Sequence, residues 1–169
     1  YLPEIKMITA ESAEAGLALA ATEAIALDPR YPEGYHMRGY TLNYVGRFQE
    51  ALEDLARVPE LGNRTGWPMA KRAIALAGLG RWDEVGRIRD EMIARAKTEF
   101  MTPDAIACMY QLLGENDEAF RWLDRAAEEQ AGYVGFMGVD AIFAPLRADP
   151  RFAPFCREHR IPELPVPRS

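Results

Sequence analysis

A seven-residue pattern recurs three times at a spacing of 34 residues, and this period restricts the chain to folds built from stacked, equivalent units. The copies are residues 46–52 (GRFQEAL), 80–86 (GRWDEVG) and 114–120 (GENDEAF). Periods between about 20 and 50 residues are typical of repeat arrays, in which each unit packs on its neighbours. We therefore expect a repeat protein.

Each copy carries signals for the end of one helix and the start of the next. A glycine follows an apolar run at the same phase each time, and glycine supplies the left-handed residue that ends a helix. Four places later comes an acidic residue, which the dipole of a new helix favours: Glu50, Glu84 and Glu118. A small or slim residue follows it, as a close helix crossing requires: Ala51, Val85 and Ala119. Each unit is predicted to be a helical hairpin.

Apolar periodicity and the positions of proline and glycine define the expected elements. The predicted helices span residues 11–27, 33–45, 48–58, 67–79, 82–97, 103–113 and 116–130, with a loop at 59–66. After Gln130 the period lapses, and we expect short capping helices at 132–138, 139–147 and 149–159, with Phe143, Leu146, Phe152 and Phe155 as the apolar side of the last two.

The 34-residue unit resembles the tetratricopeptide repeat, a helix–turn–helix family with small residues where its helices cross. The small residue at the eighth position is Gly39, Ala73 or Ala107, and the large apolar residue at the eleventh is Leu42, Leu76 or Tyr110. The resemblance implies an all-α, right-handed α-solenoid of antiparallel helix pairs with a C-terminal helical cap. The chain departs from the family at Arg38, Arg72 and Arg89, which replace apolar residues, and at Val58-Pro59.

This pattern predicts a single domain over residues 1–161. It comprises a partial first repeat (1–31), full repeats at 32–65, 66–97 and 98–131, and capping helices at 132–161, followed by a proline-rich tail at 162–169. We interpret the chain as part of a longer protein.

Composition and charge exclude several classes of function. Acidic residues outnumber basic ones, 26 to 20, and the net charge of −6 comes without a basic stripe that could neutralise phosphates. We therefore expect no direct contact with nucleic acid. The sequence contains no apolar run of the roughly 20 residues that span a bilayer, and no signal segment. The expected setting is cytoplasmic, without a membrane partner.

Catalytic, metal and cofactor motifs are missing from the sequence. The two cysteines, Cys108 and Cys156, fall on different predicted elements, and with two histidines they form no zinc-ligand spacing. Three glycines in residues 132–138 suggest a phosphate loop, but no predicted strand precedes them and no Gly-Lys-Ser/Thr follows. That segment is predicted to cover the open end of the array instead. We expect no enzyme activity, no cofactor and no bound metal.

Binding is expected on the first helices of the hairpins, which line the concave surface of a solenoid. The predicted groove residues are His36, Met37, Tyr40, Asn43, Tyr44, Trp67, Lys71, Asp104, Cys108 and Gln111. Aromatic rings with polar tips suit a protein or peptide partner. The alternative for Tyr40 and Tyr44 is a place in the core of an adjacent hairpin. The Lys/Asn clamp that holds C-terminal carboxylates in some tetratricopeptide domains is lacking at the matching positions.

The run Leu146–Phe152 (LRADPRF) resembles the end of tetratricopeptide segments in bacterial multidomain regulators. In that group the segment follows a DNA-binding domain, a nucleotide cyclase or a protein kinase. The resemblance implies a regulatory or interaction module whose partners are proteins, peptides or other domains of a parent chain. A small-molecule-sensing domain of such a regulator is the alternative.

Overall fold

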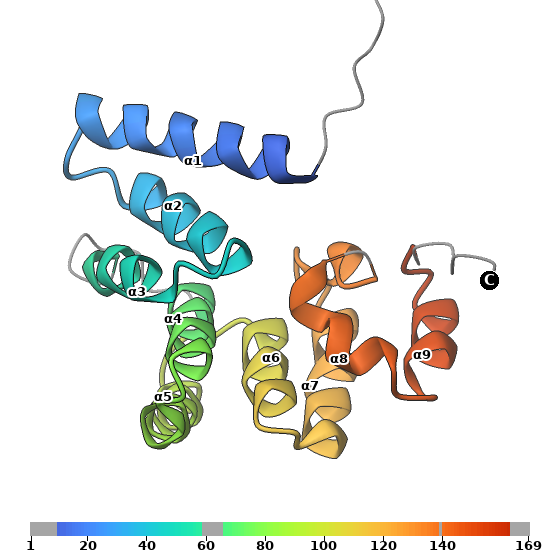
Figure 1. The fold of residues 1–169 in the computed structure, drawn as a ribbon. Helices are drawn as coiled ribbons and strands as arrows, with labels where there is room; N and C mark the ends of the chain where they lie inside the picture. Colours follow the sequence, from blue (N-terminus) through green and yellow to red (C-terminus); the bar gives the residue numbers. More distant parts are fainter. Residues whose placement is uncertain (1–9, 59–65, 139, 163–169) are drawn as a thin grey trace, which may run out of the picture. The chain divides into compact units, whose positions relative to one another are not determined.

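A computed structural model describes residues 10–58, 66–138 and 140–162, with side chains placed from Gly16 onward except at residue 141. Within these ranges the chain is helical and contains no strand (Figure 1). The α helices are α1 (Ala10–Leu27), α2 (Pro32–Tyr44), α3 (Phe48–Arg57), α4 (Gly66–Gly78), α5 (Trp82–Arg95), α6 (Pro103–Leu112), α7 (Asn116–Glu128), α8 (Ala144–Arg147) and α9 (Phe152–Glu158). Two 3₁₀ turns, η2 (Val134–Phe136) and η3 (Ala141–Phe143), precede α8.

The predicted hairpin helices are confirmed to within two residues at each end. The three repeated glycines end their helices as expected, since Gly46, Gly80 and Gly114 have φ angles of 74°, 73° and 77°. In each case the N–H of the next residue donates to the carbonyl five positions earlier, at 2.9 Å, which satisfies the last carbonyls of the helix. Of the loop predicted at 59–66, residues 59–65 lie outside the described residues, and Gly66 is the first residue of α4.

The chain divides into two compact units. The first contains the described residues of Tyr1–Arg64 together with Lys71–Glu84, and the second contains those of Thr65–Ala70 and Val85–Ser169. The single-domain organisation stays a prediction.

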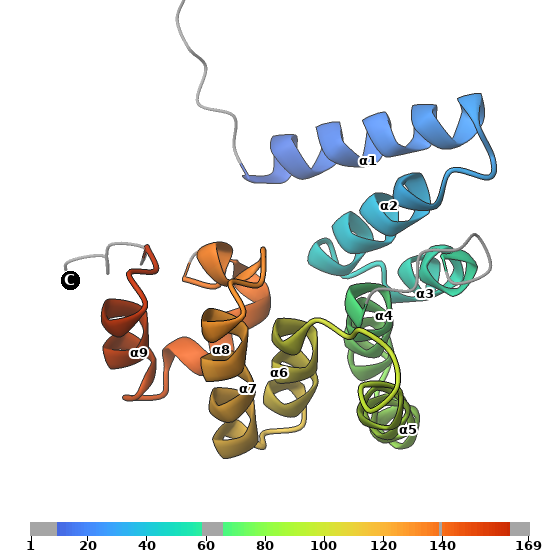
Figure 2. The ribbon, with the colours of Figure 1, turned by 180° about the vertical axis from the view of Figure 1, so that it is seen from behind.

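In the first unit, α2 packs between α1 and α3 (Figures 1 and 2). The crossing of α2 and α3 is close, because a Cβ added at Gly39 would lie 2.6 Å from Leu55 Cγ and 3.2 Å from the carbonyl oxygen of Ala51. Leu42, Ala51, Leu55 and Ala75 form the buried core. The small residues predicted at the crossing are therefore required by the packing.

In the second unit, α6 pairs with α7, and the first residue of α4 lies against both α5 and α6. A Cβ at Gly66 would lie 3.1 Å from Ala105 Cβ and 3.3 Å from Met92 Cε. Helix α9 covers α7, with ring centroids of Phe120 and Phe155 6.2 Å apart. The capping role predicted for the C-terminal helices is thus seen on α7.

The capping segments differ in detail from the prediction. The helix expected at 132–138 is the 3₁₀ turn η2, and the helix expected at 139–147 is η3 followed by the short α8. Glycines at 132, 135 and 138 explain the first difference, because glycine disfavours a continuous helix. The four residues predicted as the apolar side of the cap are all buried: Phe143, Leu146, Phe152 and Phe155.

Candidate functional site

The ten predicted groove residues fall into both units. His36, Met37, Tyr40, Asn43, Tyr44 and Lys71 belong to the first unit, and Trp67, Asp104, Cys108 and Gln111 to the second. We call the first set the tyrosine face. The two sets have different surroundings.

Two tyrosines one turn apart on α2 form the centre of the tyrosine face. The Tyr40 and Tyr44 hydroxyl oxygens are 3.0 Å apart, and their ring centroids lie 4.8 Å apart in an edge-to-face arrangement. The Lys71 ammonium lies 3.8 Å from the centroid of the Tyr40 ring, within the range of a cation–π contact. Both rings are half-buried. Tyr40 thus contacts Lys71 of helix α4, and both rings still leave part of their surface exposed.

Two polar side chains flank this pair on α2. Asn43 Nδ2 donates to the main-chain carbonyl of Lys71 at 2.9 Å, and His36 Nδ1 lies 3.2 Å from Glu33 Oε2. Burial, and then the nearby charge of Lys71, lowers the pKa of His36. The buried atoms His36 Nε2 and Asn43 Oδ1 have no hydrogen-bond partner within the described part of the chain. Met37, 37% exposed, completes the face.

In the second unit, two predicted groove residues, Trp67 and Gln111, contact the chain's own C-terminal part. We call residues 133–138 and 140–143 the cap segment. The Trp67 ring packs on the rings of Tyr133 and Phe143, at centroid distances of 4.3 and 6.3 Å. Gln111 Nε2 donates to the carbonyl of Ile142 at 2.9 Å. The carboxylate of Asp104 accepts from the main-chain N–H of Ala105 at 2.9 Å.

These contacts correct part of the sequence prediction. Trp67, Asp104, Cys108 and Gln111 were predicted groove residues, but all four are buried, Cys108 completely, and in the first unit Lys71 is buried too, at 5% exposed. In the second unit, the physical reason is that the chain folds back through the turns η2 and η3. This places the rings of Tyr133 and Phe143 against Trp67. Burial also raises the pKa of Asp104 above its usual range. The sequence signal for this burial was the group of aromatic residues just after the repeats, because large apolar rings are stabilised by packing against another apolar surface.

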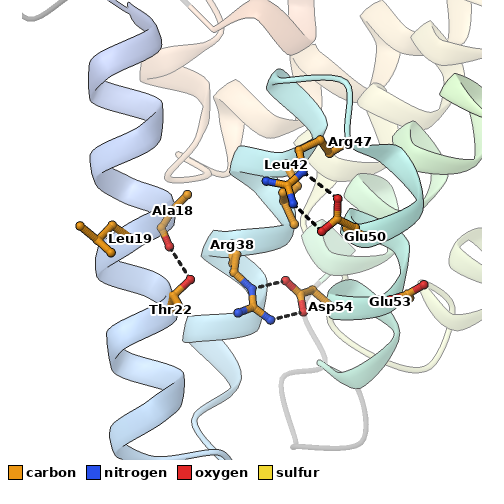
Figure 3. A pocket seen from close by; sticks show the side chains of 9 residues that line it. All are labelled: Ala18, Leu19, Thr22, Arg38, Leu42, Arg47, Glu50, Glu53 and Asp54. Carbon is orange, nitrogen blue, oxygen red and sulfur yellow. Dashed lines mark hydrogen bonds and ion pairs between the residues drawn. The ribbon is translucent and has the colours of Figure 1, made fainter.

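A pocket that the sequence did not predict opens between α1 and α3 in the first unit, with α2 as its floor (Figure 3). Its volume is about 380 Å³. The lining residues are Ala18, Leu19, Thr22, Arg38, Leu42, Arg47, Glu50, Glu53 and Asp54.

Two ion pairs occupy the polar part of this pocket. Arg38 donates to both carboxylate oxygens of Asp54, at 2.6 and 2.7 Å, and Arg47 Nε donates to Glu50 at 2.7 Å (Figure 3). Arg38 stands where the family pattern has an apolar residue, and Asp54 on α3 supplies the charge that lets it remain half-buried.

Among the described residues, no group of three or more His, Cys, Asp or Glu side chains is placed to hold a metal ion. No helix in the described ranges is long and apolar enough to cross a bilayer.

Comparison with known families supports the resemblance seen in the sequence. The tetratricopeptide repeat family matches residues 20–53, which cover the end of α1, all of α2 and the first part of α3. Comparison with curated proteins and with solved structures gave no match. The helices, packed in neighbouring pairs, define the fold class as a tetratricopeptide-like α-solenoid. The matched repeat contains all of the tyrosine face except Lys71.

Proposed function

We propose that this chain is a protein- or peptide-recognition scaffold and that it binds its partner through the tyrosine face. Tetratricopeptide repeats typically mediate interactions between proteins, and the matched repeat carries this face. The observation on which the proposal rests is the half-exposed pair of Tyr40 and Tyr44, held edge to face beside Lys71.

The arrangement suits recognition because the rings are positioned before a partner arrives. Tyr40 and Tyr44 are fixed by each other, and Tyr40 also by the Lys71 ammonium, so binding orders few additional side chains. Tyrosine combines a large apolar surface with a polar tip, and such residues often contribute most of the binding energy at interface centres. The adjacent Met37 adds an adaptable apolar side chain.

We propose further that the chain serves as the regulatory or interaction module of a larger bacterial protein in the cytoplasm. The run Leu146–Phe152 supports this part of the proposal, because it resembles the end of repeat segments in bacterial regulators. In this chain the run spans the end of α8 and the start of α9, with Leu146 and Phe152 buried. The proposed partner is therefore a separate protein or peptide, or a segment from another domain of the parent protein.

A small-molecule-sensing function has less support. The pocket of the first unit falls in the volume range of ligand sites, about 300–1,000 Å³. However, ligand sites are mostly apolar and aromatic, whereas this pocket has no aromatic residue in its lining and carries two ion pairs. The tyrosine face therefore favours a peptide partner over a small ligand.

The test is a displayed-peptide library selected on the wild-type chain, followed by affinity measurements on an enriched peptide. Tyr40→Ala and Tyr44→Ala should each weaken binding by about 2 kcal/mol, roughly thirtyfold, if the rings are anchors. Tyr31→Ala is the matched control, because Tyr31 is an exposed tyrosine outside the face. Unchanged affinity in both variants, or loss of the folded state together with binding, would reject the proposal.

A further inference from the structure

The pocket of the first unit lies on the opposite side of α2 from the tyrosine face. Arg38 and Leu42, which form its floor, are two positions before and two positions after Tyr40. Two positions on an α-helix correspond to about 200° of rotation, so both side chains leave α2 about 160° away from Tyr40. None of the residues that line the pocket is a predicted groove residue. The pocket is therefore a separate surface between α1 and α3.

The two arginines of the pocket use only one edge of their guanidinium groups. Arg38 donates through Nε and Nη2 to Asp54, and Arg47 donates through the same two atoms to Glu50. Figure 3 shows that both sets of bonds run toward α3, away from α1. Within the described part of the chain, neither Nη1 group donates a hydrogen bond, although each carries two N–H donors. The pocket thus has unused donors on two guanidinium groups.

Other arginines of this chain show what the Nη1 edge binds. Three of them hold one carboxylate through Nε and Nη2 and a second carboxylate through Nη1: Arg89, Arg95 and Arg151. Their Nη1 atoms lie 2.7, 3.5 and 2.7 Å from the second carboxylate, which belongs to an Asp or Glu side chain each time. Arg38 and Arg47 have the first acidic partner, but they lack the second among the described residues.

The pocket wall on α1 is apolar. It consists of Ala18, Leu19 and Thr22, and the Thr22 hydroxyl donates to the carbonyl of Ala18 at 2.8 Å, so its polar group is used within α1. Leu19 is 61% exposed, and covering it with an apolar group of a ligand would be favourable. Guanidinium donors and an apolar wall therefore belong to the same pocket.

The charges around the pocket are compatible with one more carboxylate. Arg38 and Arg47 are each balanced by one acid, so a bound carboxylate would give two cations three acidic partners. That ratio is lower than the two acids per arginine at the three sites described above. The remaining acid of the lining, Glu53, accepts from Gln49 at 3.2 Å and extends away from α1 (Figure 3).

We infer that this pocket is a binding site for an Asp or Glu side chain of a partner protein, with an apolar neighbour of that residue packed on Leu19. The Nη1 groups of Arg38 and Arg47 donate to the carboxylate, and such charge-assisted hydrogen bonds are about twice as strong as neutral ones. An acidic side chain is favoured over a small organic acid, because the lining has no aromatic residue of the kind that small-ligand sites usually contain. The inference is independent of the tyrosine face.

The experiment follows the NMR resonances of the full chain during titration with the blocked peptide acetyl-Leu-Glu-Leu-amide. We expect saturable shifts at Ala18, Leu19 and Thr22, which line the pocket. The peptide acetyl-Leu-Gln-Leu-amide has the same shape without the charge and should bind about tenfold more weakly.

Two arginine variants locate the carboxylate. Arg47→Gln should weaken binding of the acidic peptide about tenfold, and it should leave the fold intact because the Arg47 side chain is exposed. Arg81→Gln is the matched control and should have no effect, because Arg81 makes the same paired bonds to Glu84 one repeat later, outside the pocket. Arg38 is kept, since its removal would leave the buried Asp54 without its partner.

Several results would overturn the inference. Absence of saturable shifts at the α1 wall, or equal affinity for the Glu and Gln peptides, would show that no carboxylate is recognised. Equal effects of Arg47→Gln and Arg81→Gln would place the carboxylate elsewhere. Tighter binding of acetyl-Leu-Lys-Leu-amide would assign the pocket to cations, and tighter binding of 4-methylpentanoate would assign it to a small acid. Tyr40→Ala should leave binding of the acidic peptide unchanged, so failure here is distinct from failure of the proposed function.

Discussion

Equivalent faces of the first and second units differ in what covers them. On α2, Asn43 donates to the carbonyl of Lys71 on α4, and the nearby Tyr40 stays half-exposed. On α6, Gln111 makes the same kind of bond to the cap segment, and Cys108, in place of Tyr40, is completely buried. In both places the amide oxygen is buried without a partner among the described residues. The same repeat register thus gives an accessible aromatic face in one unit and a covered one in the other.

The two faces differ in the residue at their equivalent centre. Position 40 holds a tyrosine whose ring stays half-exposed, whereas position 108 holds a cysteine that is completely buried. In the second unit the cap segment supplies aromatic rings of its own, because Tyr133 and Phe143 pack against Trp67. The same scaffold thus leaves two tyrosine rings half-exposed in the first unit and buries the equivalent position 108 in the second.

The largest expected effect comes from uncovering the second unit. Phe143 is fully buried against Trp67, so Phe143→Ala should lower the free energy of unfolding by about 3–5 kcal/mol. Phe136→Ala, in the same segment but exposed, should have little effect. Urea unfolding followed by circular dichroism measures both, and equal effects would show that the segment is not packed as described.

A smaller effect on the free energy of unfolding is expected at the close helix crossings, which both units contain. Ala51 and Ala119 occupy equivalent positions at helix crossings and are both fully buried. Ala51→Leu and Ala119→Leu should each destabilise the chain by about 1–3 kcal/mol, because an enlarged side chain separates the helices. Ala94→Leu, on an exposed position of α5, is the control. If all three variants have the same urea midpoint, the assigned register is wrong.

The smallest effect is a difference in pH dependence between the units. Burial lowers the pKa of His36, so its contribution to stability is present above the ordinary value of 6.5 and is lost as pH falls through the lowered pKa. Burial raises the pKa of Asp104, so its contribution is present below the ordinary value of 3.8 and is lost as pH rises through the raised pKa.

Urea unfolding of the wild type, His36→Phe and Asp104→Asn between pH 4 and 7 separates the two groups. Relative to His36→Phe, the wild type should lose stability on acidification. Relative to Asp104→Asn, it should gain stability over the same change. Parallel curves for the wild type and both variants would mean that neither group is buried as the structure places it.

The hairpins could be predicted from sequence because their signals are local. Glycines at 46, 80 and 114 end helices through their own backbone conformation, and the small residues after each acidic residue fix the crossing. Both signals lie within one 34-residue unit, so no knowledge of distant contacts is needed.

The covered face and the pocket could not be predicted in the same way. Coverage depends on Tyr133 and Phe143 reaching Trp67, a contact between residues more than 60 positions apart that no local pattern specifies. The pairing of Arg38 with Asp54 spans 16 positions between the two helices of one hairpin. An arginine in an apolar position is a signal to search for such a carboxylate on the partner helix.

Hydroxyl-radical footprinting of the native chain, read residue by residue by mass spectrometry, tests the difference between the two faces most directly. Met37 of the tyrosine face is 37% exposed and Met137 of the cap segment is 0% exposed, while Trp82 and Trp67 are 51% and 8% exposed. We expect rapid oxidation of Met37 and Trp82 and protection of Met137 and Trp67, with all four reactive after unfolding in urea. Oxidation of Met137 and Trp67 in the native chain as fast as that of Met37 and Trp82 would contradict it.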